Sequence, residues 1–288
     1  IVGGFQGVSY RRDITTLGRG GSDTTAVALA AALDADRCEI YSDVDGVYSA
    51  DPSVVSDARH LPELSYPVMQ EMSTAGAKVL NAHAVQFAKE KQIAVYARAS
   101  FAPGRETVVR LMPPEAITGV QAVVSEERMT RVRFSGADAL KHFDRAVRLL
   151  EERQVQIKEV NVSHVAEDAG RSRAGFVVSS ANVYGWESLE SELAGRFGDA
   201  VAFDHDLAAL SLIGEGLNRN NLALTATMDL LRERGIPLAG VTTTSFRISL
   251  LVPRERIEEG VRICHRRWIE GHAPLPEGQP GGAVELER

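Results

Sequence analysis

A glycine-rich segment near the start of the chain, TTLGRGGSDTTAVALAAAL, has residues suited to binding an anion. Three glycines within residues 18–21 allow the backbone to approach a ligand closely. Ser22 and Asp23 follow at the start of an alanine-rich run, and the free N–H groups at a helix start favour anions. The alternative is an ordinary glycine-rich turn in which Ser22 or Asp23 caps the helix. No Gly-Lys-Ser/Thr follows, which excludes a Walker-type phosphate loop.

Two further segments carry candidate ligand groups. The first, YSDVDGVYSADP (residues 41–52), places Asp43 and Asp45 in a loop directly after the apolar run CEIYS. The loop lacks the later Glu of an EF-hand, so calcium is not expected, whereas a loop after a strand's carboxyl end is where α/β folds bind nucleotides. The second, GAKVL (76–80), contains Lys78. Lys78 alone is an ordinary surface charge, but beside the other segments it could hold a phosphate.

The remaining reactive side chains indicate packing rather than chemistry. The seven histidines show no HxxxH or Cys/His spacing, so we expect surface or structural roles and no metal site built from protein side chains. Cys38 opens an apolar run and is expected in the core. The first residues, IVGG, are those of an activated trypsin-like protease, but no GDSGG-type nucleophile segment follows, which excludes that class.

The composition is that of an ordinary soluble globular protein with roughly two domains. The 288 residues are 44% hydrophobic and 25% charged, and the net charge of −7 gives no reason to expect nucleic acid as a partner. Two cysteines cannot form a disulfide framework, and no apolar run reaches the roughly 18–20 residues that cross a bilayer. With no secretory leader either, we expect a cytoplasmic protein without a membrane partner.

The elements that must position the candidate residues alternate between strands and helices over residues 1–111, the pattern of an α/β layer. We expect strands at Ile1–Val2, Cys38–Ser42 and 93–99, a helix at Thr24–Leu33, and one or two helices within Tyr66–Lys91. Residues 110–114 have the composition of a linker.

Beyond the linker one pattern occurs twice. LLEERQVQIKEVNVS from Leu149 and LLRERGIPLAGVTTT from Leu230 align with an offset of 81 residues, and each takes a helix through a turn into a β-branched strand. The repeat predicts two βαββα-type modules, at 128–206 and 207–270. Their expected helices are Ala137–Arg153 and Trp186–Phe197 in the first module, and Asn221–Arg234 and Arg254–Trp268 in the second.

A strand upstream of the repeats has no partner in the first module. It is ITGVQAVV at 117–124, and the second module lacks a last strand. Since an open edge on an antiparallel sheet is a liability, we predict that 117–124 completes the second module. Residues 271–288 are rich in Pro and Gly and are predicted to be a disordered tail.

Taken together, TTLGRGGSD, SDVDGVYSADP and GAKVL, in this order, resemble the amino-acid kinase superfamily and specifically the aspartokinases, over roughly residues 1 to 268. The two repeated units are similar to the tandem ACT domains of that family. The resemblance implies an α/β fold: the C-terminal part of a three-layer α/β/α amino-acid kinase domain, followed by two ferredoxin-like (ACT) α+β modules.

The implied reaction transfers the γ-phosphoryl group of ATP to the side-chain carboxylate of L-aspartate, giving 4-phospho-L-aspartate, the first step of lysine, threonine and methionine biosynthesis. Mg²⁺ would be held mainly through the phosphates. The resemblance assigns Arg19, Gly20 and Gly21 to substrate binding, Ser22 and Asp23 to the transfer site, and Ser42, Asp43, Tyr48 and Lys78 to the nucleotide.

The resemblance also implies regulation. ACT modules pair and bind amino acids near their first strand-to-helix turn, here around Asp138 in the first module and around Asn218 and Asn220 in the second. Lysine or threonine would be the effector, and the chain would form a homo-oligomer through these modules. The alternative for each turn residue is ordinary loop and cap chemistry.

Several departures from the family pattern qualify these expectations. A KFGG-type segment is absent, so we expect the chain to lack the front of the kinase domain and to be inactive alone. Ser53 stands where the family commonly has Arg, and Asn81-Ala82 where it has His-Pro. The alternative function is a non-catalytic, amino-acid-binding regulatory subunit of an aspartokinase, although a purely regulatory chain has little reason to keep Arg19, Ser22, Asp23 and Lys78.

Overall fold

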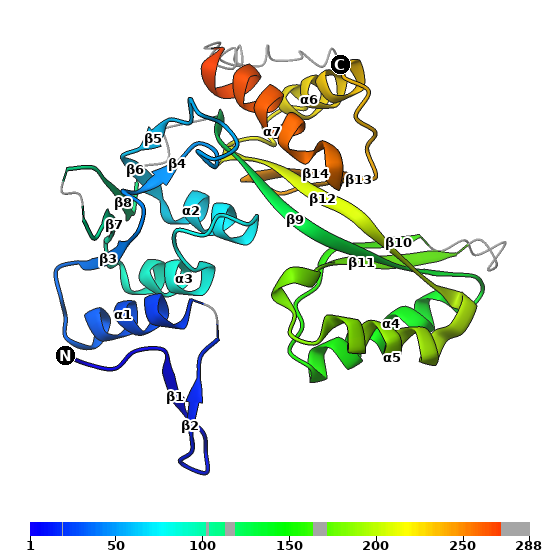
Figure 1. The fold of residues 1–288 in the computed structure, drawn as a ribbon, viewed down its shortest axis with the longest axis horizontal. Helices are drawn as coiled ribbons and strands as arrows, with labels where there is room; N and C mark the ends of the chain where they lie inside the picture. Colours follow the sequence, from blue (N-terminus) through cyan, green and yellow to red (C-terminus); the bar gives the residue numbers. More distant parts are fainter. Residues whose placement is uncertain (19, 102–103, 113–118, 164–171, 272–288) are drawn as a thin grey trace, which may run out of the picture.

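The fold is known from a computed structural model, which describes residues 1–18, 20–101, 104–112, 119–163 and 172–271 (Figure 1). Predictions that concern residues 113–118, or the tail after Gly271, therefore lie outside the described residues. Two bodies are visible, a helix-rich α/β part at the amino-terminal end and a long twisted sheet with its own helices (Figure 1).

A four-stranded sheet forms the centre of the α/β part. Its order is β3 (Cys38–Ser42), β7 (Val95–Ala99), β8 (Glu106–Arg110) and β6 (Glu63–Ser65), with β3 and β7 parallel. The helices α1 (Gly21–Ala32), α2 (Tyr66–Thr74) and α3 (Ala82–Lys91) pack with this sheet around an apolar core. Two small antiparallel pairs complete the part: β1 (Gln6–Val8) with β2 (Ile14–Thr16), and β4 (Val47–Tyr48) with β5 (His60–Leu61).

Local sequence explains where these helices begin. Ser65 accepts a hydrogen bond from the Val68 N–H at the start of α2, and a proline occupies the first turn. Asn81 accepts from the N–H groups of His83 and Ala84 at the start of α3. The helix α1 begins at Gly21, three residues before the predicted Thr24, because Gly20 takes the left-handed conformation that ends the preceding turn.

The second body is a six-stranded antiparallel sheet with the order β10-β11-β9-β12-β14-β13. The strands are β9 (Gly119–Ser135), β10 (Lys158–Ser163), β11 (Arg173–Ser179), β12 (Val201–Glu215), β13 (Gly240–Thr243) and β14 (Arg247–Pro253). The helices α4 (Ala139–Glu152) and α5 (Trp186–Phe197) pack with one half of the sheet, and α6 (Leu222–Glu233) and α7 (Ile257–His265) with the other.

Two long strands run through both halves of this sheet (Figure 1). The second part of β9 pairs with β11, while residues 119–126 pair with 209–215 of β12, whose other side pairs with β14. Each half therefore has the strand order of a βαββαβ ferredoxin-like unit, and the two units exchange strands through β9 and β12. Residues 119–124 of the predicted 117–124 strand lie in the half that carries α6 and α7.

Three details differ from the sequence-based expectation. The strand predicted at Ile1–Val2 is wrong, because both residues are exposed and lie outside any strand. The predicted start of the first module at residue 128 falls inside β9, and the predicted boundary between the modules at 206–207 falls inside β12; both strands are continuous, with register shifts in their pairing. The single helix predicted at Arg254–Trp268 is a 3-10 turn (Arg254–Arg256), α7, and a π-helical turn, η5 (Arg266–Glu270).

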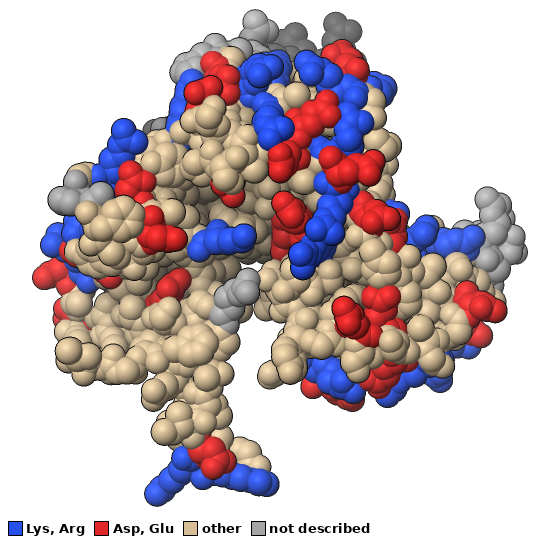
Figure 2. All heavy atoms as spheres, in the orientation of Figure 1, with Lys and Arg blue, Asp and Glu red and all other residues tan. Residues whose placement is uncertain are grey.

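Charge is distributed unevenly over the face drawn in Figure 2. Basic and acidic side chains alternate over the half of the sheet that carries α6 and α7, whereas the region of α1 is largely uncharged. The region is uncharged because α1 is rich in alanine and has a single charged residue, Asp23. Leu33, just after the helix, is 76% exposed. None of the described helices combines the length and apolar composition needed to cross a membrane.

Candidate functional site

The glycine-rich turn before α1 is shaped by close contact with the start of α3. Gly20 has φ 77°, and a Cβ atom there would lie 2.6 Å from the Cβ atom of Asn81. Gly21 is buried, and a Cβ atom on it would lie 2.6 Å from the Cβ atom of Leu17. Only glycine fits both positions, so the N–H groups at the start of α1 are held in a compact turn.

Asp23 joins this turn to the segment that carries Lys78. Its Oδ2 atom accepts a hydrogen bond from the backbone N–H of Asn81 at 3.1 Å, and Oδ1 accepts from the Ser22 hydroxyl at 3.4 Å. The Asn81 side chain in turn caps α3. The start of α3 therefore lies beside the first turn of α1, and the Asp23 carboxylate is itself the anion at the start of α3.

The loop after β3 forms the second part of the candidate site. The Ser42 hydroxyl accepts a hydrogen bond from the Val44 N–H, and the Ser42 carbonyl accepts from the N–H of Ser100. The Asp43 side chain is exposed at the turn. The loop then enters β4, where the Val47 N–H donates to Thr107 Oγ1 at 2.7 Å and fixes the strand against β8.

Tyr48 is half-buried at the end of this loop. Its hydroxyl donates to Asp45 Oδ1 at 2.8 Å, and its ring meets the edge of His60 with centroids 5.4 Å apart. Burial raises the pKa of Tyr48, and the Asp45 hydrogen bond adds to the rise. The tyrosine is therefore neutral at physiological pH and can offer a flat, fixed aromatic surface.

Lys78 lies on the connection between α2 and α3, and its side chain is exposed. The structure brings Asp23 and Asn81 together, whereas among the described residues no hydrogen bond or ion pair joins Lys78 to Asp43 or Tyr48. Arg19, expected to bind the substrate carboxylate, lies outside the described residues.

The predicted effector residues lie at the turns before α4 and α6. Asp138 accepts from Lys141 of its own helix at 2.8 Å, and this hydrogen bond lowers the pKa of the Asp138 carboxyl. Asn218 donates to the Ser245 hydroxyl at 3.4 Å, while Asn220 accepts from the Leu222 N–H at 2.9 Å. All three are exposed, and these local bonds are the cap and turn chemistry given as the alternative to effector binding.

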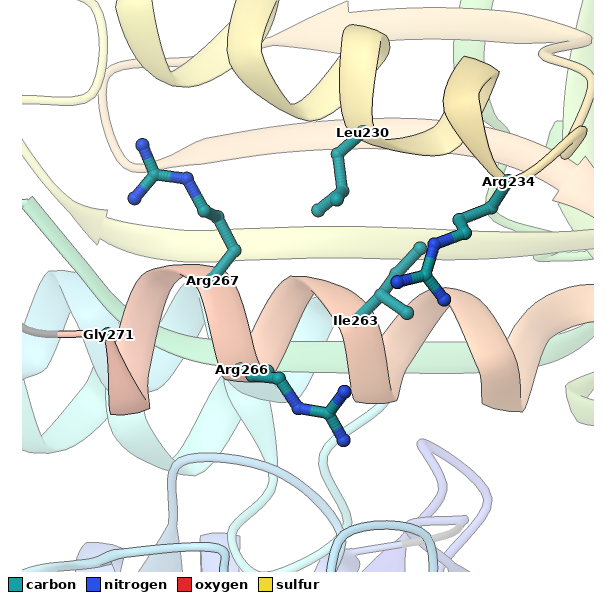
Figure 3. Close-up of a pocket in the computed structure, with 6 residues that line it drawn as sticks. All are labelled: Leu230, Arg234, Ile263, Arg266, Arg267 and Gly271. Carbon is teal, nitrogen blue, oxygen red and sulfur yellow. The ribbon is translucent and has the colours of Figure 1, made fainter.

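A further hollow lies between α6 and α7 and is lined by Leu230, Arg234, Ile263, Arg266, Arg267 and Gly271 (Figure 3). Its three guanidinium groups point in different directions, and that of Arg267 lies over the Trp268 ring, 4.8 Å from its centroid. The basic side chains therefore do not converge on one anion.

Comparisons with known proteins identify the relatives of this chain. The amino acid kinase family model matches residues 1–97. Aspartokinase from Mycolicibacterium smegmatis is 38% identical over 282 residues, covering 93% of this chain and 65% of that protein, and aspartokinase from Mycobacterium tuberculosis H37Rv is 39% identical with the same coverage. The chain belongs to the aspartokinase family.

Solved structures extend the likeness to the three-dimensional fold. E. coli aspartokinase III in complex with lysine and aspartate has a TM-score of 0.72 at 26% identity, covering 92% of this chain and 59% of that one. The same enzyme in complex with aspartate and ADP has a TM-score of 0.75, covering 91% and 59%. The first body is thus an amino acid kinase fold and the second a pair of ACT-type modules. The chain spans about 65% of the length of the curated aspartokinases named above.

The two departures from the aspartokinase pattern have definite structural roles. Ser53 is exposed, and both its N–H and its hydroxyl donate to Asp51 Oδ1, so it closes a turn and supplies no cation to the loop. Asn81 caps α3 and binds Asp23 through its backbone. The Asn81 departure thus preserves the entry of α3, whereas the Ser53 departure removes a positive charge.

Two sets of hydrogen bonds that hold the loop after β3 were not predicted from the sequence. Thr107 binds the Val47 N–H and the Leu61 carbonyl, and Ser49 forms a buried hydrogen bond with His265 of α7. Thr107 lies in an ordinary strand pattern, and Ser49 and His265 are 216 positions apart, so no local signal marks either contact. Asn81 could have been found, because an Asn directly before a helical pattern is an N-cap signal.

Proposed function

We propose that the chain is the phosphoryl-transfer and regulatory part of an aspartate kinase, which phosphorylates L-aspartate with ATP. The Asp23–Asn81 hydrogen bond is the observation that carries the proposal, because this contact between the glycine-rich turn and the segment that follows Lys78 supports a common site for the two. In E. coli aspartokinase III that fold is complexed with aspartate and ADP. The two buried free cysteines suit a reducing compartment, so we also propose a cytoplasmic protein.

The side chains present fit the substrates of this reaction. The N–H groups at the start of α1, in a turn where a Cβ atom would collide, suit the aspartate carboxylates, and Arg19 is assigned to the α-carboxylate by resemblance. The exposed Lys78 suits the phosphates of ATP, and the Tyr48 ring suits the adenosine. Mg²⁺, held mainly by the phosphates, would neutralise charge on the transferred group.

Regulation by an amino acid is part of the proposal. The E. coli enzyme has been solved with lysine in a T-state and with ADP in an R-state. The turns around Asp138, Asn218 and Asn220 are the proposed effector sites in this chain, with lysine or threonine as the effector. Association of copies through the ACT-type modules is also proposed, with module limits of 128–206 and 207–270.

A regulatory subunit without catalysis is the second candidate function. The observation that favours it concerns Ser53, whose N–H and hydroxyl both donate to Asp51. The proposed nucleotide loop therefore lacks the Arg that the family commonly has at this position. This candidate predicts amino-acid binding without nucleotide binding, whereas the kinase proposal predicts both.

The kinase proposal is tested by trapping aspartyl phosphate as its hydroxamate in the gene product that carries this chain. ATP- and aspartate-dependent hydroxamate formation should fall by about a hundredfold or more in Arg19→Ala, since lost substrate orientation has a large effect on rate. Arg12→Ala, in the exposed turn of the β1–β2 hairpin, is the matched control and should keep full activity. Equal activity in the two variants would refute the role given to Arg19.

A further inference from the structure

The second half of the proposed nucleotide loop is built into the core of the second ACT-type module. Ala50 and Val55 are 5% and 6% exposed and belong to the same apolar cluster as Ile257 and Val261 of α7. Arg262 of α7 also donates from Nε to the Val54 carbonyl at 3.0 Å. The loop that leaves β4 thus reaches α7 (Figure 1) and packs there as one of the module's own segments.

A buried chain of hydrogen bonds crosses this boundary next to Tyr48. Ser49 Oγ lies 2.8 Å from His265 Nε2, and His265 Nδ1 lies 2.9 Å from Glu270 Oε1 in η5. The side chains of Ser49 and His265 are completely buried, with exposures of 0%. Breaking such a contact would leave a buried polar group without a partner, which is costly.

The hydrogen-bond partners allow one consistent arrangement of the protons. Ser49 Oγ accepts the Arg59 N–H at 2.8 Å and keeps its own proton, which it can donate to Nε2 of His265. The imidazole then carries its proton on Nδ1 and donates it to the Glu270 carboxylate. In this arrangement each donor of the chain meets an acceptor.

The backbone of Ser49 is fixed as firmly as its side chain. The Ser49 carbonyl accepts from the Val123 N–H of β9 at 2.7 Å, and the Ser49 N–H donates to the Arg59 carbonyl at 2.8 Å. Because Tyr48 directly precedes Ser49, these bonds and the His265 bond together hold the backbone from which the Tyr48 side chain extends. Contacts from α7 and β9 in the second module therefore fix the position of Ser49, at the end of the loop.

We propose that Ser49 and His265 are positioning residues that let the second ACT-type module hold the nucleotide loop, so that the state of this module sets nucleotide affinity. The proposal rests on the proposed function, because that function is what assigns nucleotide binding to this loop. Linkage makes the effect reciprocal: nucleotide bound by the loop stabilises the α7–loop contact by the same factor. Among the described residues, the first module makes no hydrogen bond with residues 49–58.

Hydrogen exchange of the chain, followed by mass spectrometry, tests the link without requiring activity. The probes are the peptides that cover residues 45–59 in the wild type, Ser49→Ala, His265→Gln and His265→Leu. Loss of one buried hydrogen bond should speed exchange in these peptides by about two- to tenfold. His265→Gln keeps an acceptor for Ser49, so its effect should lie between the wild type and His265→Leu.

The matched control is Thr227→Val. Thr227 is also completely buried in the second module, and its hydroxyl binds Ala223 and Trp268 but does not reach the loop. This variant should destabilise the module without faster exchange at 45–59. Equal exchange at 45–59 in Ser49→Ala and Thr227→Val, or no rescue by His265→Gln, would overturn the positioning role.

Titration of Mg·ADP into the same proteins separates this proposal from the proposed function. The dissociation constant should rise in Ser49→Ala, because the loop is then less firmly held in its binding position, and stay unchanged in Thr227→Val. An unchanged constant in Ser49→Ala would overturn the inference. Faster exchange in Ser49→Ala with no nucleotide binding by any form would support the structural link and contradict the kinase proposal.

Discussion

Asp23 illustrates how one residue serves both the fold and the proposed chemistry. The resemblance assigns it to the transfer site, and the structure shows it holding the start of α3 through the Asn81 N–H. Its place at the start of a helix could be predicted from the sequence, because acidic residues are favoured in a first helical turn. Its partner could not be predicted, because residue 81 lies 58 positions away and reaches it through the backbone.

Glu159 is a half-buried acid in β10, and its ionised form is less favourable in the folded protein than in the unfolded chain. Burial raises the pKa of its carboxyl, opposed by a hydrogen bond from Ser249. Because the folded-state pKa lies above the unfolded-state pKa, the stabilising contribution is complete at low pH and is lost as pH rises through the folded-state pKa. At neutral and alkaline pH, the ionised Glu159 therefore lowers the free energy of unfolding.

Glu159→Gln should accordingly raise the Tm at pH 8, with the gain shrinking towards pH 5, because Gln keeps an acceptor for Ser249 without a charge. Thermal unfolding of both proteins across that range is the measurement. Glu127→Gln, at an exposed site on β9, is the control and should show no such trend. A gain in Tm that is the same at pH 5 and pH 8 would contradict the account.

At the scale of elements, helices were easier to predict than strand continuity. The helix α5 has the predicted bounds and α4 and α6 lie within a few residues of theirs, because caps and apolar spacing are local signals. The continuity of β9 and β12 was missed, because the polar residues at 126–128 and 204–206 have the composition of turns. Pairing between distant strands, which only the tertiary structure shows, makes them single strands.

Arg128 marks the change between the two halves of β9. It has φ 59°, and the register of β9 with β12 shifts between Glu126 and Met129. A β-branched residue is strained in this conformation, whereas glycine adopts it freely. Arg128→Val should therefore lower the free energy of unfolding by about 1–2 kcal/mol, and Arg128→Gly should be tolerated, as measured by urea denaturation. If both substitutions lowered the free energy of unfolding equally, the loss would come from the Arg128 side chain and not from the backbone conformation.

At the scale of the whole molecule, the kinase part and both modules meet at Lys158. Its Nζ atom lies 2.5 Å from Glu126 Oε2 and donates to the Thr74 carbonyl at the end of α2 at 2.9 Å. Glu126 is 8% exposed, and Asn182 donates to its other oxygen at 3.4 Å. No periodicity or motif in the sequence indicates this junction, because its members come from four separate segments.

Lys158→Met should leave Glu126 as a buried charge without its cation and lower the free energy of unfolding by about 2–3 kcal/mol, somewhat reduced because Lys158 keeps solvent contact. Lys158→Met combined with Glu126→Leu should recover most of the loss. Arg148→Ala, which breaks the exposed pair with Asp144, should have no measurable effect. Urea denaturation measures all three, and no recovery in the double variant would contradict a charge-based junction.

Nucleotide binding by the chain tests the central claim most directly, because it distinguishes a kinase from a purely regulatory subunit. In calorimetric titrations with Mg·ATP, the wild type should bind, and Lys78→Ala should bind about tenfold more weakly, the loss of roughly one charge-assisted hydrogen bond. Lys91→Ala, at the exposed end of α3, should bind like the wild type. No binding by the wild type, or equal affinity in all three proteins, would contradict the kinase account.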